Sequence, residues 1–468
     1  MQLPILNGVY TDQQSDFRVS YPFNMMPIPV NQGISNGYLR PLEGISPGPR
    51  TGPGVSRNGI NWEDVCYRVM GSELVSINPV GIVTSIGVVG NDGKRTTLDY
   101  SFDHLGVVSN GNFFLYDGTT FQQVTDPDLG TVFDFIWVDG YFMLTDGEFL
   151  IVTELNDPTS VNPLKYGSSE ADPDPIKAIV KLRNEPYALN RYTIEVFDNI
   201  GGTGFPFQRI DGAQVQRGTI GTHTCCVFLE NVAFVGGGRN ESISVWLASS
   251  GSSVRIATRE IDQILQTYPE SVLSEISIEP RVDRGHQFLY IHLPNETLVY
   301  DASASSLAGE PVWFVAGSGL ERGSEYRARD LVWCYDKWLV GDSKTNAIGF
   351  LDYAVTSHWG EQVGWNFDTI VVYNEGRGAI FHELELVGLS GRAKLGVDDT
   401  IYTQYSIDGE TYSKRKYIKS GKIGDRNRRL VWIGQGHMRN WRVQRFGGSS
   451  KSGLSVARIE ARVEPLGV

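Results

Sequence analysis

The same short pattern recurs along most of this chain: an apolar run that alternates with polar residues, a short polar turn, and a second run. Alternation with a period of two is typical of half-buried strands, and two such runs joined by a tight turn form a β-hairpin. Four turns carry Asn-Gly or Asp-Gly, which accept the positive φ angles of tight β-turns, at residues 110–111, 117–118, 139–140 and 146–147. The chain is therefore expected to be all-β.

The spacing of the pattern favours a β-propeller. Most of the runs begin about 40 to 60 residues apart, and they lie at residues 66–77, 106–116, 133–144, 178–188, 225–235, 288–299 and 331–340. Two-hairpin units at such a spacing are typical of four-stranded propeller blades. Because a blade cannot bury its faces alone, we expect a closed ring of about six or seven blades over residues 61–373. A large pair of β-sandwiches is the alternative.

The two ends of the chain have a different texture. Residues 1–60 are rich in Pro, Gly and Asn, which predicts an extended N-terminal arm with the first strands, lying along its own propeller or along a neighbour. Residues 374–468 contain further strand-like runs and a hairpin turn at 406–409, which predict a β-sandwich-like domain.

Helical spacing is found at one place, a predicted insertion near residues 258–276. Apolar residues at 261, 264 and 265 share one face of a helix over 259–268, Thr258 is a suitable N-cap, and Pro269 ends the helix. A second short turn is expected near 271–276.

The charge of the chain is large and unevenly distributed. Its formal net charge is −13, which argues against a protein that coats nucleic acid, because phosphate backbones bind to basic surfaces. Residues 414–462 nevertheless hold 14 Lys and Arg against Asp425 and Glu460, so that the chain before residue 414 carries −24. The basic C-terminal part is either a solvated strand face or a surface that docks on an acidic neighbour.

The four cysteines form no CxxC pair, and adjacent Cys225 and Cys226 would point to opposite faces of a strand. We interpret all four as buried free thiols of a protein made in the reducing cytoplasm of a host cell. Residues 1–12 do not resemble a signal peptide, and the longest uncharged stretch, 74–91, is broken by Pro and Gly, so no membrane span is expected.

A search for chemistry finds no catalytic, cofactor-binding or metal-binding motif. His382-Glu383 lacks the second histidine of a zinc motif, and no phosphate-binding loop occurs. The acid-rich loops at 126–128 and 172–175 offer oxygen ligands for calcium, but far fewer than the six to eight that the ion takes. A propeller glycosidase would need two carboxylates that meet at the ring centre, which a sequence does not reveal. The chain is predicted not to be an enzyme.

Several segments, in order along the chain, resemble the packaged-DNA stabilisation proteins, or tail hubs (nozzles), of short-tailed bacteriophages (podoviruses). The strongest is residues 291–305, IHLPNETLVYDASAS. The others are NGYLRPLEGI at 36–45, RGTIGT at 217–222, IAT at 256–258 with the short helix after it, SIDGE at 406–410 and RRLVWIG at 428–434. None is a catalytic motif. The resemblance is specific because the segments occur in the same order along the chain as in the family.

The resemblance implies a structural protein of the virion tail. Members of the family attach below the portal and its adaptor ring, form a six-fold ring, close the DNA exit channel to retain the packaged genome, anchor the tail needle and tailspikes, and form part of the genome ejection conduit. DNA would pass through the channel without sequence-specific binding, and acidic subunits would give it a negative wall that repels phosphates. A receptor- or glycan-binding propeller of the tail is the alternative function, and a propeller glycosidase is a third.

The basic C-terminal domain supplies the candidate protein interface. Arginines suit acidic partners, and tryptophans act as aromatic anchors. The candidate residues are Arg426, Arg428, Arg429, Trp432, Arg439, Trp441, Arg442 and Arg445. The alternative is a solvated strand face with tryptophans in the domain core.

Overall fold

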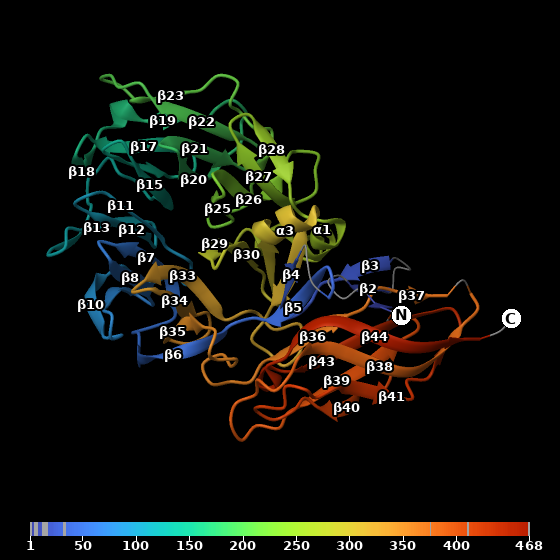
Figure 1. Cartoon of the computed structure of the whole chain (residues 1–468). Helices are drawn as coiled ribbons and strands as arrows, with labels where there is room; N and C mark the ends of the chain where they lie inside the picture. Colours follow the sequence, from blue (N-terminus) through green and yellow to red (C-terminus); the bar gives the residue numbers. More distant parts are fainter. Residues whose placement is uncertain are drawn as a thin grey trace.

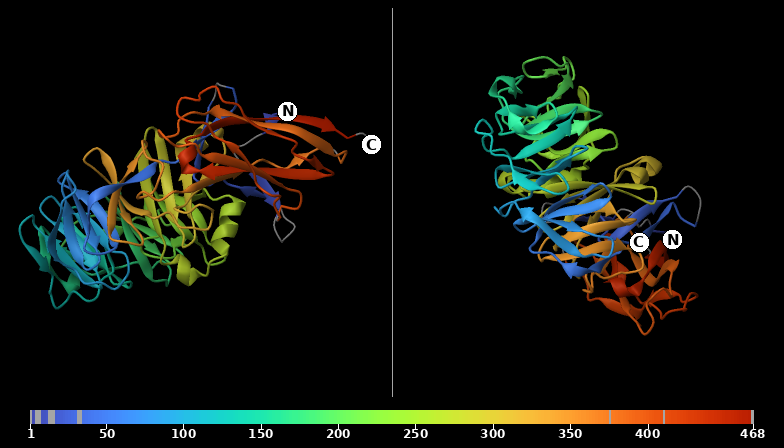
Figure 2. Two further views of the ribbon diagram at one scale, coloured as in Figure 1. Left: turned by 90° about the horizontal axis from the view of Figure 1, so that it is seen from below. Right: turned by 90° about the vertical axis from the view of Figure 1, so that its left-hand side faces the viewer.

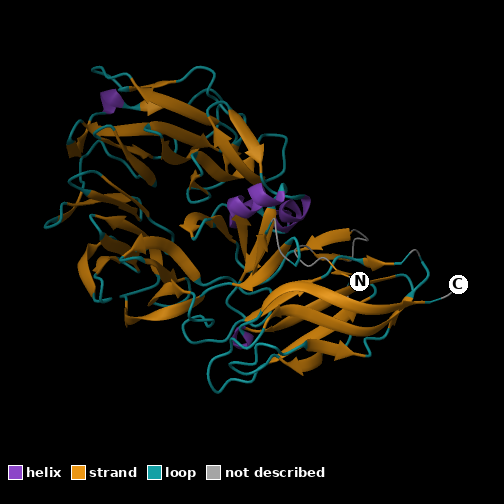
Figure 3. Ribbon diagram, viewed as in Figure 1, coloured by secondary structure: helices purple, strands orange, loops and turns teal. Residues whose placement is uncertain are grey.

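The computed structural model describes residues 2–3, 8–11, 17–30, 34–374, 376–409 and 411–466. Strands dominate these residues and form two bodies, a ring of small sheets and a two-sheet sandwich beside it (Figures 1 and 3). The prediction of an all-β propeller with a C-terminal sandwich is confirmed. Other parts of the predicted arm, including residues 4–7, 12–16 and 31–33, lie outside the described residues.

The described residues form seven blades, and the first strand of each blade lies innermost, except in blade 5, where the second strand does. Blade 1 consists of β7 (Ser56–Trp62), β8 (Val65–Met70), β9 (Glu73–Ile77) and β10 (Val83–Val88). Blade 2 consists of β11 (Thr97–Tyr100), β12 (Leu105–Ser109), β13 (Asn112–Tyr116) and β14 (Phe121–Gln123). Blade 3 consists of β15 (Asp134–Val138), β16 (Tyr141–Thr145), β17 (Phe149–Glu154), β18 (Asp157–Val161) and β19 (Gly167–Ser168), with a 3-10 turn at Pro163–Lys165.

The remaining blades follow the same plan. Blade 4 consists of β20 (Ile176–Leu182), β21 (Glu185–Asn190), β22 (Ile194–Asn199) and β23 (Phe207–Arg209). Blade 5 consists of β24 (Gly218–Thr219), β25 (Cys225–Phe228), β26 (Asn231–Gly237), β27 (Ser244–Ser249) and β28 (Ser252–Arg255). Blade 6 consists of β29 (Ser277–Asp283), β30 (His286–His292), β31 (Thr297–Asp301) and β32 (Val312–Ala316). Blade 7 consists of β33 (Ala328–Cys334), β34 (Lys337–Asp342), β35 (Ala347–Asp352) and β6 (Gly44–Thr51).

The ring is closed by a strand from the N-terminal region. Each innermost strand contacts the next, and β33 of blade 7 contacts β7 of blade 1. The outermost strand of blade 7 is β6, which pairs antiparallel with β35. Blade 7 therefore consists of strands from the two ends of the propeller sequence, which keeps the first and last blades together.

Tight turns connect the first two strands of most blades. At Asp139 and Gly140 both φ angles are positive, 50° and 86°, as the sequence predicts for a tight hairpin turn. Other blades use the same geometry without glycine: Arg183 and Asn184 have φ angles of 52° and 70°. The glycine-based turn predictions are confirmed, and the glycine-free turns were not predicted.

Buried carboxylates on the innermost strands link neighbouring blades. Asp134 of blade 3 accepts a hydrogen bond from the backbone N–H of Ile179 in blade 4 (2.7 Å) and another from the Thr97 hydroxyl in blade 2 (2.9 Å). Asp99 of blade 2 accepts one from the backbone N–H of Trp137 in blade 3 (2.7 Å). Burial raises the pKa of both carboxyl groups, that of Asp134 to about 7, because it disfavours the charged form.

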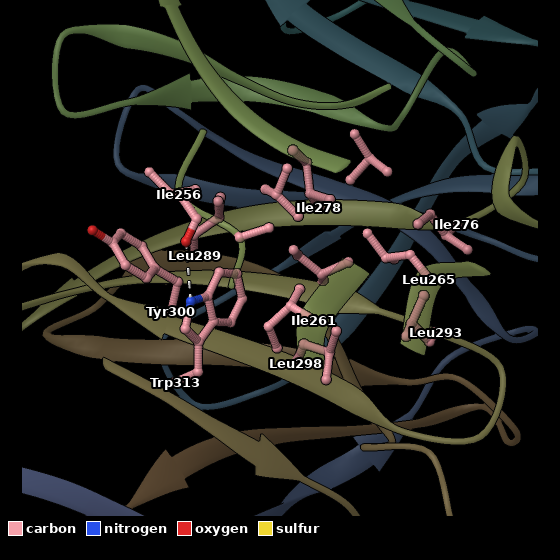
Figure 4. Packing of buried hydrophobic residues seen from close by; sticks show 14 of the residues in the cluster. Ile256, Ile261, Leu265, Ile276, Ile278, Leu289, Leu293, Leu298, Tyr300 and Trp313 are labelled. Carbon is pink, nitrogen blue, oxygen red and sulfur yellow. Dashed lines mark hydrogen bonds between the residues drawn. The ribbon is translucent and has the colours of Figure 1, made fainter. Parts of the chain in front are cut away.

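Helices α1 (Arg259–Gln266) and α2 (Glu270–Leu273) lie between blades 5 and 6, where the sequence predicts the helical insertion. Thr258 caps α1 as predicted. Ile261 and Leu265 of α1 pack on blade 6 in a core that also buries Trp313, whose indole N–H donates to the carbonyl of Ile256 (Figure 4). A third helix, α3 (Ala302–Ala308), was missed, although Asp301 and Gly309 cap its two ends.

The sandwich combines strands from both ends of the chain. One sheet contains β4 (Met25–Pro29), β5 (Gly37–Pro41), β44 (Ser455–Pro465), β38 (Ala379–Leu389) and β41 (Leu430–Ile433), with β1 (Gln2–Leu3) on β44 and β42 (His437–Met438) on β38. The other contains β36 (Gly364–Asp368), β43 (Trp441–Ser449), β39 (Thr400–Ser406) and β40 (Lys416–Lys419), with β37 (Val372–Tyr373) on β43 and a 3-10 turn at Ser450–Ser452 after it. A hairpin of β2 (Gly8–Thr11) and β3 (Phe17–Ser20) lies beside it.

The described parts of the N-terminal region therefore belong to both bodies. The β4–β5 hairpin joins the sandwich, and β6 joins the propeller. Figure 2 shows the sandwich projecting from one side of the propeller, with both chain ends on the sandwich. The sequence prediction placed the start of the C-terminal domain at residue 374, whereas the sandwich strand β36 already begins at Gly364.

Residues 20–24 connect the two bodies. Phe23 exchanges backbone hydrogen bonds with Asn366 of β36, at 2.8 and 3.2 Å. On the propeller side, the N–H of Asn24 donates to the carbonyl of Val315 in β32 (2.8 Å). The Asn24 amide donates to the carbonyls of Gly317 and Gly364 and accepts from the N–H of Gly317. The segment is thus bonded to blade 6 and to the sandwich at the same time.

The four cysteines are free, with Cys66 and Cys334 buried and Cys225 and Cys226 half-buried. No helix among the described residues is long and apolar enough to cross a membrane.

Asp134 predicts a pH dependence of stability. Its ordinary pKa of 3.8 is raised to about 7 in the fold. Between about pH 4 and 7 the folded chain holds a proton that the unfolded chain has released, so the free energy of unfolding falls as the pH rises, by up to about 1.4 kcal/mol per pH unit. D134N removes this proton, so the free energy of unfolding, measured by chemical denaturation, should change less with pH in this variant. The exposed variant D211N should keep the wild-type slope; an unchanged slope in D134N would contradict the assignment.

Candidate protein interface

The eight candidate residues all belong to the sandwich, four of them in strands and four in connecting loops. Trp432 is in β41, and Trp441, Arg442 and Arg445 are in β43. The others lie in connecting loops: Arg426, Arg428 and Arg429 before β41, and Arg439 between β42 and β43.

Trp432 belongs to the sandwich core. Its side chain is buried beside Phe446, with ring centres 5.5 Å apart, and its indole N–H donates to the carbonyl of Lys416 (2.9 Å). The interface prediction is therefore corrected for this residue, because alternation on β41 turns Trp432 inward. Trp441 is half-buried at the start of β43.

Arg442 is also internal. It is fully buried between the rings of Phe381 and Tyr405, at 4.3 and 4.1 Å from the ring centres. It donates to the Gln435 carbonyl and twice to the Gln444 side chain. Burial lowers its pKa to about 10. Because these contacts use the guanidinium inside the sandwich, Arg442 is removed from the candidate interface.

Arg445 is bound to a buried acid. Its guanidinium donates to both oxygens of Asp368, at 2.6 and 2.8 Å, and to the hydroxyl of Tyr412 (2.9 Å). Burial disfavours the charge of Arg445, but the Asp368 carboxylate outweighs it and raises the pKa above its ordinary value. Arg445 therefore stabilises the pairing of β36 with β43, and its charge is neutralised within the domain.

The four remaining arginines, Arg426, Arg428, Arg429 and Arg439, are exposed. Arg429 is paired with Glu383 (3.3 Å) and Glu385 (2.6 Å), although its side chain is 67% exposed. Arg428 lies 3.8 Å from Asp425, an exposed pair that is weakened by solvent.

Two adjacent loops, residues 391–398 and 420–429, form the most basic part of this surface; we call them the basic loop pair. The Gly424 N–H donates to the carbonyl of Gly391 (3.0 Å), which holds the loops together. The first loop adds exposed Arg392 and Lys394, which the sequence prediction missed because they precede the basic segment. Two large apolar side chains project from the loop pair, Leu395 (85% exposed) and Ile423 (54% exposed). Exposed apolar groups among like charges are typical of an interface.

The propeller brings its acid-rich loops together. Tyr166 donates to the carbonyl of Asp128, and burial raises its pKa together with the charges of Asp128, Asp126 and Asp146. Glu148 lines an open recess with residues 169–175 of the next acidic loop. No group of His, Cys, Asp or Glu suited to hold a metal ion occurs in the part of the chain that the structure describes. The loops form one acidic surface at blades 3 and 4, on which Asp172 is paired with Arg239 (2.8 Å).

Two carboxylates do meet in the central channel of the propeller. Glu279 of β29 accepts hydrogen bonds from the backbone N–H groups of Asp330 and Leu331 in β33, and Arg95 lies 2.6 Å from Asp330 and 3.4 Å from Glu279. Burial favours the neutral form of Asp330, but the charges of Arg95 and Arg68 outweigh it and lower the pKa. A glycosidase needs one carboxyl group that keeps a proton, so this charge-neutralised pair is suited to linking blades.

Because Arg445 is bound to a buried acid, we expect its substitution to lower the stability of the sandwich and not to act on assembly directly. R445M leaves the Asp368 carboxylate buried without its cation, and we expect a loss of about 3 kcal/mol in the free energy of unfolding, measured by urea denaturation. R439M at an exposed position should change it by less than about 0.5 kcal/mol. An R445M protein of wild-type stability that fails to assemble would place Arg445 at an interface.

Comparisons with known proteins agree with this architecture. Residues 1–356 match the family described as "Bacteriophage P22 Gp10, beta-propeller", and residues 364–464 match "Bacteriophage P22 Gp10, beta-sandwich". The chain is 27% identical, over an alignment of 485 positions, to the tail hub protein gp10 of Salmonella phage P22, and the alignment covers 99% of both chains. Solved structures are more distant. The N-terminal domain of Nup159 has a TM-score of 0.42 and 8% sequence identity, over 69% of this chain and 97% of that chain. PorZ of Porphyromonas gingivalis has a TM-score of 0.37 and 12% sequence identity, over 79% of this chain and 46% of that chain. The chain belongs to the bacteriophage P22 Gp10 family.

Proposed function

We propose that this chain is a structural tail hub of a short-tailed phage. In this role it attaches below the portal and adaptor ring, closes the DNA exit channel, and anchors the tail needle and tailspikes in the virion tail. The observation that carries the proposal is the likeness to a tail hub protein over 99% of both chains, through propeller and sandwich alike. A closed propeller that is hydrogen-bonded to a second domain is suited to such a role, because it offers several partners rigid surfaces.

The central channel of the propeller does not serve as the DNA conduit. Arg95, Glu279 and Asp330, which come from different blades, contact one another within it. The conduit therefore lies between copies of the chain, in a six-fold ring of the kind that the family resemblance implies. A net charge of −13 per copy favours a negative wall along which phosphates slide without adhering.

The basic loop pair is the surface that we assign to assembly. It carries Arg392, Lys394, Lys422, Arg426 and Arg428, and the chain before residue 414 carries −24. Charge complementarity speeds association and selects the partner, while the exposed Leu395 and Ile423 supply apolar area. The acidic surface at blades 3 and 4 of a neighbouring copy has the complementary charge.

Particles assembled without this chain test the hub role. We expect heads that package DNA and then lose it, and that lack needle and spikes, because nothing closes the channel or holds those parts. Retained DNA is measured by quantitative PCR after nuclease treatment, and tail composition by mass spectrometry. Full heads with a complete tail that fail to infect would contradict the proposal and favour a receptor-binding role.

Charge reversal tests the interface. The double variant R426E/R428E should fold normally, because both side chains are exposed, and should assemble on tail-less particles more weakly, with a loss that changes with salt concentration. Sedimentation of the bound chain with particles across a salt series measures this. R183E, at a propeller arginine of 62% exposure, is the matched control. Normal assembly of R426E/R428E at every salt concentration would remove the basic loop pair from the interface.

A further inference from the structure

The central channel of the propeller contains a cavity of about 490 Å³, within the range of about 300–1,000 Å³ that is usual for small-molecule sites. It is bordered by residues of blades 1, 5, 6 and 7, and its lining is polar for a protein interior. Asn61, Ser277 and Glu279 lie along it with Trp333 and Trp338. We call it the channel cavity.

Two uncharged polar groups of residues that line the channel cavity have no partner among the described residues. The hydroxyl of Ser277, a residue only 1% exposed, has no hydrogen-bond partner among the described residues. The indole N–H of Trp338 is likewise buried and unpaired in the part of the chain described. A buried donor without a partner costs about 1–3 kcal/mol, so a polar ligand that reaches both would recover that free energy on binding.

Aromatic rings accompany these donors. Trp333 packs against Trp338, with ring centres 5.4 Å apart, and Trp333 remains 48% exposed. The Asn61 amide donates to the carbonyl of Trp333 (2.9 Å), which ties β7 to β33 beside the cavity. A flat apolar surface next to hydrogen-bond donors suits a ligand that has both C–H faces and hydroxyl edges.

A second recess of about 290 Å³ lies next to the channel cavity. Consecutive residues of β7 line the two: Asn61 the cavity and Trp62 the recess. Phe102 projects from the recess with 82% of its surface exposed, and it packs edge-on with Trp137 at 5.4 Å. The Ser101 hydroxyl accepts from the backbone N–H groups of residues 103 and 104, which holds the turn that carries Phe102. Each of the two hollows therefore carries an exposed aromatic ring, Trp333 in the cavity and Phe102 in the recess.

We propose that the channel cavity and the adjoining recess bind a neutral polysaccharide, with consecutive sugar units in the two hollows. Sugar rings stack their C–H faces on Trp333 and Phe102, and their hydroxyls pair with Ser277, Trp338 and the carboxylate of Glu279. Glu63 and Asp99 line the recess with a single lysine, Lys181, so the lining disfavours phosphate-bearing chains. The inference stands independently of how copies of the chain assemble.

Isothermal titration of the full-length chain with maltohexaose, cellohexaose and chitohexaose tests the inference. We expect saturable binding of at least one of the three. W338F keeps the ring and removes the unpaired N–H, and S277A removes the unpaired hydroxyl. Because neither donor has a partner in the fold, both variants should keep the wild-type melting temperature and bind about five- to tenfold more weakly. F102A should weaken binding by about fivefold through the lost ring contact.

Y417A, at an exposed tyrosine of the sandwich, is the matched control and should bind like the wild type. Binding that W338F, S277A and F102A leave unchanged would place the saccharide elsewhere and overturn the inference. Failure of the wild type to bind any of the three saccharides at millimolar concentration would also overturn it, and would leave this propeller face to a protein partner.

Discussion

The relative placement of the two bodies depends on residues 20–24, which form hydrogen bonds with the edge strand of blade 6 on one side and with the sandwich strand β36 on the other. Asn24 is the centre of this contact. Its φ angle of 53° turns the backbone from one partner to the other, and its amide satisfies buried carbonyls of both Gly317 and Gly364. Few residue types combine tolerance of that backbone angle with donors and an acceptor in one short side chain. Two domains that could otherwise move independently are thereby held as neighbours.

The same region also determines how the fold closes. The N-terminal strands are distributed over both bodies, since β4 and β5 complete the sandwich and β6 completes blade 7. The partner of β6 lies about 300 residues later in the chain, and the partner of β5 in the sandwich, β44, lies later still. Such non-local pairing is slow to form, because long loops must close before any contact stabilises them. The innermost carboxylates of Asp99 and Asp134 connect neighbouring blades within the ring that this outer strand closes.

The sequence was most informative where local chemistry alone determines structure. Asp139-Gly140 predicts its turn because glycine readily adopts a positive φ, and Thr258 predicts the start of α1 because its hydroxyl satisfies a free backbone N–H. Turns such as Arg183-Asn184 adopt the same backbone without glycine, held by the strands on either side, and no local pattern reveals them. The burial of Trp432 and Arg442 was not predictable either, because it depends on which face of each strand meets the opposite sheet. Arg426, Arg428 and Arg429 of the basic loop pair were found because they belong to a run of basic residues, whereas Arg392 precedes that run and was missed.

Closure of blade 7 by β6 has a mechanical consequence. A force that separates the sandwich from the propeller reaches β6 through its N-terminal end, where the chain comes from β5. Gly44 of β6 pairs with Asp352, the end of β35 from which the chain runs on to the sandwich strand β36. The same force therefore enters both paired strands at the same end, and it pulls β6 and β35 in one direction instead of apart. The pairing that closes blade 7 is thus spared when the two connections to the sandwich carry a load.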